Sequence, residues 1–79
     1  MYYVYILKSS IDNSKYIGAT SNLKNRLIEH NNGETKTTKS KAPYNLIWYS
    51  AFVSKELAYS FEKYLKSSSG HAFTNKHFI

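Results

Sequence analysis

The sequence predicts a small α/β (α+β) domain whose elements follow the order β-β-α-β-α. Aromatic and β-branched residues gather in three short segments, and turn residues separate the first two. Stretches with helical periodicity and capping residues follow the second and third segments. We therefore expect a three-stranded, mostly antiparallel sheet flanked by helices. The length of 79 residues suits a single domain, residues 1–79.

The first two strands are expected to form a hairpin. Residues 2–8, YYVYILK, and residues 15–19, KYIGA, are rich in strand-forming side chains. Asp12 and Asn13 supply turn chemistry between them. Gly18, near the end of the second segment, indicates a bend or a close approach of the backbone.

The first helix is expected to begin at a cap, Thr20 or Ser21, and to run to about Asn31. An asparagine and a glycine after that residue favour its end there. Its apolar side is predicted to consist of Leu23, Leu27 and Ile28. A second stripe carries three polar residues at a spacing of four, Asn22, Arg26 and His30.

Residues 34–45 read as a polar loop with three lysines, and residues 46–53, LIWYSAFV, as the third strand. This segment is almost continuously apolar, which predicts a strand that is covered on both faces. Ser54 is expected to cap the second helix, KELAYSFEKYLK. Glu62 borders the predicted buried face of that helix, which holds Leu57, Ala58, Phe61 and Leu65.

Composition limits the classes of function. The formal net charge of +6 favours polyanionic partners, above all nucleic acid. The chain has no cysteine, which excludes a disulfide framework and thiolate metal sites. Its first residues lack the pattern of a signal peptide, and its apolar runs are too short for a membrane span. We therefore expect a cytoplasmic protein without membrane contact.

Two charged residues suit phosphodiester chemistry. Arg26 is the only arginine in the chain, and the planar fork of a guanidinium matches two phosphate oxygens. Glu62 offers a carboxylate of the kind that holds magnesium. Each residue also has a plainer interpretation. Arg26 could be a solvated helix residue, and Glu62 could form an ion pair with Lys66 one turn on.

Three further residues could handle protons or water. His30 could accept or relay a proton, because its ordinary pKa lies near neutrality. Tyr5 and Tyr16 could hold or deprotonate a water, but a tyrosine base needs its pKa lowered from about 10 by nearby cations or a metal ion. The alternatives are a surface histidine without a chemical role and tyrosines that only pack in strands. In the tail, His71 and His77 give a weak metal signal.

Together these segments resemble the GIY-YIG nuclease family. The paired motifs are YVY at residues 3–5 and YIG at residues 16–18. In the first of them Tyr3 stands where the family has glycine. The resemblance covers nearly the whole chain, since it continues through NLKNRLIEHNNG, KAPYNLIWY and ELAYSFEKYLK. The likeness is strongest to small single-domain, UPF0213-like members, whose relatives include homing endonucleases and the incision subunit of a bacterial DNA repair pathway.

The resemblance implies a three-stranded antiparallel sheet flanked by helices. It also implies a metal-dependent endonuclease that hydrolyses DNA phosphodiester bonds, with selectivity for DNA structure left open. Tyr5 and Tyr16 match the two motif tyrosines, and Arg26 matches the arginine clamp. His30 matches the histidine of many members. The water that attacks the phosphate would then be activated by one of the tyrosines with this histidine nearby.

Glu62 matches the single metal-binding carboxylate of the family, which implies Mg²⁺ or Mn²⁺ as the cofactor. Many family nucleases also carry an asparagine beyond the glutamate helix, and Asn75 is the candidate for it in this chain.

Two alternatives to a nuclease stay open. The chain could be a nucleic-acid-binding module that keeps the fold but does not cut. Lysines of the polar loop would then track phosphates while exposed rings stack on bases. These lysines are Lys36, Lys39 and Lys41. The chain could also be an accessory protein that docks a partner enzyme. As a nuclease with one site, it could dimerise in order to cut both strands.

Overall fold

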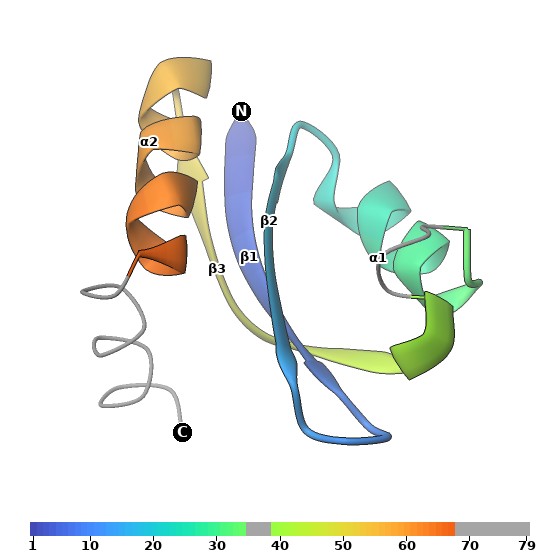
Figure 1. Cartoon of the computed structure of the whole chain (residues 1–79). Helices are drawn as coiled ribbons and strands as arrows, with labels where there is room; N and C mark the ends of the chain where they lie inside the picture. The colour runs from blue at the N-terminus through green and yellow to red at the C-terminus, as the bar shows by residue number, and fades with distance from the viewer. Residues whose placement is uncertain (35–38, 68–79) are drawn as a thin grey trace.

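The computed structural model describes residues 1–34 and 39–67 and contains one antiparallel sheet of three strands (Figure 1). The strands are β1 (Tyr2–Ser9), β2 (Lys15–Thr20) and β3 (Tyr44–Phe52), in the spatial order β2-β1-β3. The helices are α1 (Leu23–Asn31) and α2 (Lys55–Lys66), and a short 3₁₀ helix, Lys39–Lys41, precedes β3. The predicted order β-β-α-β-α and the antiparallel sheet are confirmed.

The two helices lie on opposite faces of the sheet (Figure 1). On the α2 side, the buried cluster consists of Val4, Ile6, Ile17, Ala58 and Leu65. On the α1 side, it consists of Tyr5, Leu7 and Tyr44. The central strand supplies both clusters because successive side chains of a strand point to opposite faces. β1 is therefore the strand that is covered on both faces.

The prediction that the third strand is covered on both faces was wrong. β3 is an edge strand, and its burial pattern alternates between exposed and partly buried residues. Trp48 packs toward α2, with its ring 5.8 Å from that of Phe61. Tyr49, the next residue, is 53% exposed. A three-stranded sheet has one central position, and β1 occupies it.

The hairpin turn forms as predicted. Asn13 adopts a φ of 62°, in the left-handed region that asparagine tolerates better than most residues. The backbone N–H of Ser14 donates to Oδ1 of Asp12 over 3.0 Å. This pattern is an Asx turn, and it joins β1 to β2.

The first helix begins later than predicted. Its N-cap is Asn22, whose Oδ1 accepts from the backbone N–H of Asn25 over 3.1 Å. Thr20 instead accepts from the N–H of Asn22 and so shapes the turn before the helix. The helix ends at Asn31, as predicted. Ile28 is exposed, so its predicted place on the apolar side was wrong.

The second helix keeps its predicted cap and bounds. Oγ of Ser54 accepts from the backbone N–H of Leu57 over 3.3 Å. Ala58 and Leu65 are fully buried, as predicted. Leu57 is exposed, which corrects the predicted buried face. The apolar stripe of α2 is narrower than expected, and Glu62 borders it with a side chain that is 20% exposed.

No helix within these described ranges has the length and apolar character that crossing a membrane requires.

Candidate active site

The site is built around Tyr5, which lies in the central strand with only 1% of its surface exposed. Its direct partner in β2 is Gly18. The tyrosine ring covers this glycine, since a Cβ atom there would lie 2.5 Å from the Tyr5 hydroxyl oxygen. The close backbone approach predicted at Gly18 is therefore present. It lets a large ring lie flat across the neighbouring strand.

The Tyr5 hydroxyl is hydrogen-bonded to Nε2 of His30 over 3.0 Å. It also forms a hydrogen bond with the guanidinium of Arg26. A guanidinium can only donate, so the Tyr5 oxygen accepts from Arg26 and its own proton is left for His30. This arrangement requires His30 to be unprotonated at Nε2. The histidine and the arginine both come from α1, one turn apart.

His30 is fully buried, which corrects the alternative of a surface histidine without a role. Its ring lies 4.9 Å from the ring of Tyr16 and 6.2 Å from that of Tyr44, measured between centroids. Burial lowers the pKa of His30, and the nearby positive charge of Arg26 lowers it further. His30 is therefore neutral at pH 7 and can accept a hydrogen bond from the Tyr5 hydroxyl.

Burial raises the pKa of Tyr5 to about 12, and the neighbouring Tyr16 raises it as well. The hydrogen bond and charge of Arg26 act in the opposite direction but do not offset the burial. Tyr5 is therefore a neutral hydroxyl at any ordinary pH. The condition for a tyrosine base, a lowered pKa, is not met at this residue.

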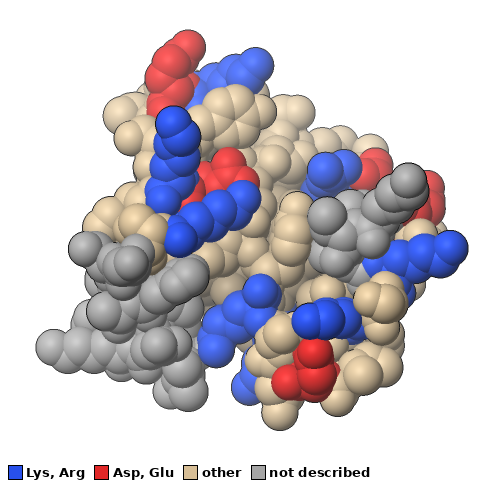
Figure 2. Space-filling model, in the orientation of Figure 1, with Lys and Arg blue, Asp and Glu red and all other residues tan. Residues whose placement is uncertain are grey.

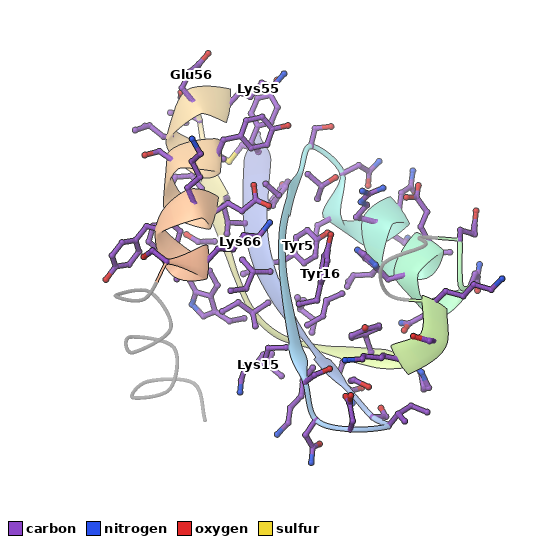
Figure 3. All side chains as sticks on the ribbon, viewed as in Figure 1. Tyr5, Lys15, Tyr16, Lys55, Glu56 and Lys66 are labelled. Atoms are coloured by element: carbon purple, nitrogen blue, oxygen red, sulfur yellow. The ribbon has the colours of Figure 1, made fainter. Side chains whose placement is uncertain are left out.

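Tyr16 lies beside Tyr5 at the end of the site nearer to solvent. The two rings are 6.4 Å apart between centroids, and Tyr16 is only partly buried. Figure 3 shows both tyrosines on the side of the strands that faces α1. Of the two motif tyrosines, Tyr16 is thus the one that a water or a substrate can reach.

Arg26 also pairs with Glu29, with 2.8 Å between Nη1 and Oε1. Both side chains are partly exposed. The pKa of Arg26 is raised by the hydrogen bond with Glu29 and then by that with Tyr5. This partner was not predicted from the sequence, although the i, i+3 spacing of a basic and an acidic residue on one helix could have indicated it. The pair orients the guanidinium, and the negative charge of Glu29 partly offsets its positive charge.

Glu62 lies on the other helix, and its charge makes a small contribution that raises the pKa of Tyr5. Oε2 of Glu62 accepts from Nζ of Lys66 over 2.9 Å, which is the ion pair that the spacing allowed. Lys66 extends from α2 toward the strands that carry Tyr5 (Figure 3). Two helices on opposite faces therefore bring charges of opposite sign to one tyrosine.

The donors present fit a hard divalent cation that keeps most of its water. No group of three or more His, Asp or Glu side chains gathers in the part of the chain that the structure describes. Glu62 offers a partly exposed carboxylate whose charge acts on Tyr5, whereas the carboxylate of Glu29 is paired with Arg26. Mg²⁺ is commonly held by one or two carboxylates together with water and substrate phosphate. This donor set therefore suits Mg²⁺ or Mn²⁺ and does not suit a closed structural site.

The predicted DNA-binding lysines are only partly described. Lys39 and Lys41 are exposed on the 3₁₀ helix, and Lys41 forms an ion pair with Asp12 at 3.2 Å. Lys36 and Asn75 lie outside the described residues, as do His71 and His77. Basic side chains border the central tan surface on its α2 side and below it, with an acidic group among them (Figure 2). A polyanion that lies on this surface would meet that positive charge.

Comparisons with known proteins agree with this architecture. Residues 1–76 match the GIY-YIG catalytic domain. A UPF0213 protein of Clostridium perfringens is 45% identical over 67 residues, which cover 84% of this chain and 71% of that protein. A UPF0213 protein of Streptococcus pyogenes serotype M3 is 42% identical over 65 residues, covering 81% of this chain and 70% of that protein.

A solved structure is also similar. The solution NMR structure of a UPF0213 protein from Bacillus halodurans aligns with a TM-score of 0.58 at 32% identity, over 99% of this chain and 87% of that one. GIY-YIG nucleases are generally metal-dependent and act on nucleic acid, so the match supports a nuclease-like role. The chain belongs to the GIY-YIG catalytic domain family.

Proposed function

We propose that this protein is a metal-dependent endonuclease that hydrolyses phosphodiester bonds of DNA at the site around Tyr5. One observation carries the proposal. The Arg26 guanidinium from one helix lowers the pKa of the Tyr5 hydroxyl, and the charge of the Glu62 carboxylate from the other helix raises it. A phosphate ester needs both groups, because the first can bind its oxygens and the second can hold a cation against them.

Arg26 is proposed to bind the scissile phosphate. Its guanidinium is partly exposed, and its bonds to Glu29 and Tyr5 use only part of its donors. Because its pKa is raised, the side chain keeps its charge throughout the working range of pH. Lysine could supply the charge but not the planar fork that matches two phosphate oxygens.

Tyr16 is proposed to hold the attacking water, and Tyr5 to fix the geometry around it. Tyr5 keeps its proton and donates a hydrogen bond to His30. His30 is therefore a positioning residue. In the reaction the water oxygen bonds to phosphorus and gives up a proton to solvent water, while the ester bond breaks and the leaving oxygen takes up a proton from solvent water. Of the two motif tyrosines, only Tyr16 is exposed enough to contact the attacking water.

Glu62 is proposed to hold Mg²⁺ or Mn²⁺. When bound, such a cation supplies positive charge for the phosphate and for the leaving oxygen. The ion pair with Lys66 engages Oε2 of Glu62 and competes with this role. Because the lysine side chain is 53% exposed, opening the pair costs about 0.2–1 kcal/mol. A bound divalent cation can offset a cost of that size.

The test uses the purified full chain with supercoiled plasmid and with branched DNA, in the presence of Mg²⁺, Mn²⁺ or a chelator. We expect cleavage that the chelator abolishes and that Glu62→Gln lowers by about a hundredfold or more. Glu56→Gln is the matched control, because Glu56 lies at the far end of α2, away from the tyrosines (Figure 3). Equal cleavage by the wild type and Glu62→Gln would end the proposal.

A binding module without cleavage is the second candidate, and the state of Tyr5 and Glu62 favours it. Tyr5 has a raised pKa, and Glu62 is paired with Lys66. A protein that only binds DNA would need neither a base nor a cation. That candidate predicts DNA binding that does not depend on Mg²⁺, is unchanged in Glu62→Gln and weakens steeply as the salt concentration rises. It also predicts that the DNA is not cut.

A further inference from the structure

A groove of about 460 Å³ opens on the α1 face of the sheet, beside the residues of the candidate active site. Pockets that hold small molecules have volumes of about 300–1,000 Å³, so this one is large enough for a nucleotide. Its walls come from β1, β3 and the start of α1. The residues used below are Tyr3, Asn22, Lys24 and Tyr49.

Two tyrosines form the floor of the groove. The rings of Tyr3 and Tyr49 are 6.3 Å apart between centroids and tilted by 58°. They are diagonal neighbours in the β1–β3 ladder, since Tyr3 is opposite Ala51 and Tyr5 is opposite Tyr49. Tyr49 is 53% exposed, which leaves much of its ring to a flat ligand.

The groove is continuous with the proposed site. Tyr3 and Tyr5 are two residues apart in one strand, so their side chains emerge on the same face about 7 Å apart. This distance is close to the spacing of successive phosphates along an extended nucleic acid strand. Asn22, which lines the groove, lies one turn before Arg26 on α1, so a strand whose phosphate is held by Arg26 would bring a neighbouring base to the groove.

The polar groups of the groove suit the same ligand. Lys24 lies at its rim with an exposed side chain, and none of its described lining residues is acidic. Asn22 contributes a side-chain amide that can hydrogen-bond to a base edge. Aromatic rings with a flanking lysine are the usual means by which proteins bind single-stranded nucleic acid.

We propose that this groove binds an unpaired nucleobase of the DNA strand, next to the phosphate held by Arg26. The inference rests on the proposed function and deepens it by naming the class of substrate, DNA with an unpaired base beside the cleaved bond. Tyr49 supplies the stacking surface, Tyr3 holds its ring in place, and Lys24 pairs with the adjoining phosphate. The YVY sequence makes this floor possible, because glycine in place of Tyr3 would leave Tyr49 without its partner.

The experiment measures the affinity of the full chain for a labelled oligothymidylate of about ten nucleotides, by fluorescence anisotropy with a chelator present. We expect Tyr49→Leu to weaken binding about five- to a hundredfold, the size of losing one stacked base. Tyr49→Phe should keep most of the affinity because it keeps the ring. Tyr59→Leu, an exposed tyrosine of α2 outside the groove, should change the affinity less than twofold.

A second measurement does not depend on the variants being folded. Adding the oligothymidylate to the isotope-labelled wild type should shift the amide resonances of Tyr3, Lys24 and Tyr49. Shifts elsewhere only, no measurable binding, or equal affinity of Tyr49→Leu and the wild type would each overturn the proposal. So would a self-associating wild type that becomes monomeric in Tyr49→Leu at unchanged affinity for DNA.

Failure of the subsite and failure of the nuclease proposal give different results. If Glu62→Gln abolishes cleavage while Tyr49→Leu leaves binding unchanged, the groove proposal alone is overturned. If the wild type binds the oligothymidylate through Tyr49 but cuts no DNA, the groove proposal stands as a binding site and the nuclease proposal falls.

Discussion

The ring of Tyr5 lies over Gly18 with no room for a side chain between them. A Cβ atom on Gly18 would be 2.5 Å from the tyrosine hydroxyl oxygen and 2.6 Å from Cζ. Both distances are below those at which carbon atoms pack. The glycine of the YIG sequence therefore sets the position of the hydroxyl that His30 and Arg26 contact.

We predict that Gly18→Ala displaces the Tyr5 ring. The new methyl group should destabilise the protein by about 1–3 kcal/mol, the usual cost of overpacking a core. Cleavage should fall at least tenfold, because the displaced hydroxyl no longer aligns Arg26 and His30. Urea denaturation gives the free energy of unfolding, and single-turnover kinetics at saturating protein give the rate.

Gly33→Ala separates this effect from simple destabilisation. Gly33 has a φ of 73°, so alanine there should cost about 1–2 kcal/mol through backbone strain. A Cβ atom on Gly33 would make ordinary contact with Cγ of Lys39, at 3.5 Å, and would not contact Tyr5. Stability should fall and the cleavage rate should not. Equal rate losses in both variants would refute the positional role of Gly18.

The two motif tyrosines should respond differently to the loss of the hydroxyl. Tyr5→Phe removes the hydrogen bond to buried His30 and should lower the unfolding free energy by about 1–3 kcal/mol. The cleavage rate should fall as well. Tyr16→Phe keeps the ring that packs against His30, so stability should stay within about 0.5 kcal/mol while cleavage falls. Thermal unfolding and cleavage rates of the two variants check this. Tyr16→Phe with full activity would remove Tyr16 from the proposed mechanism.

The sequence predicted the order of elements because the signals for it are local. Strand-forming residues, the Asx turn at Asp12 and the cap at Ser54 act within a few positions of the chain. The position of the third strand could not be predicted in this way. The apolar run of β3 fits a buried strand equally well, and only the pairing of β1 with both neighbours makes β3 an edge.

The candidate site shows the same division. The residue types and the family resemblance named Tyr5, Arg26 and Glu62, and in the structure the charges of Arg26 and Glu62 both act on the Tyr5 hydroxyl. The raised pKa of Tyr5 was not predictable, because it results from burial that the sequence does not encode locally. The contact of Tyr3 with Tyr49 depends on the register of two strands that are distant in sequence.

His30 should make the stability of the protein depend on pH near neutrality. Burial lowers the pKa of His30 in the folded state, whereas in the unfolded chain it is about 6.5. The unfolded state therefore binds more protons, and the free energy of unfolding falls as the pH drops below about 6.5. The slope that His30 contributes is at most about 1.4 kcal/mol per pH unit.

The measurement is the urea-unfolding free energy of the wild type and of His30→Gln between pH 7.5 and pH 5.5. The variant should be less stable throughout but should show a shallower slope. Asp12 and Glu56, whose pKa values are lowered by hydrogen bonds, lose their contribution only at lower pH. His71 and His77 are present in both proteins, so the difference in slope reports His30. Identical slopes would contradict a buried, neutral His30.

Lys66 should compete with the divalent cation for Glu62. Lys66→Gln removes the ion pair of 2.9 Å, so the concentration of Mg²⁺ that gives half the maximal cleavage rate should fall about two- to fivefold. Lys55→Gln removes the same charge from the other end of α2 and should leave this concentration unchanged (Figure 3). Both variants should bind DNA slightly more weakly, since each lacks one cation. Because the loss of charge is common to both, only the Mg²⁺ requirement isolates the ion pair. A Mg²⁺ titration of cleavage with equal midpoints in the two variants would show that Lys66 does not restrain Glu62.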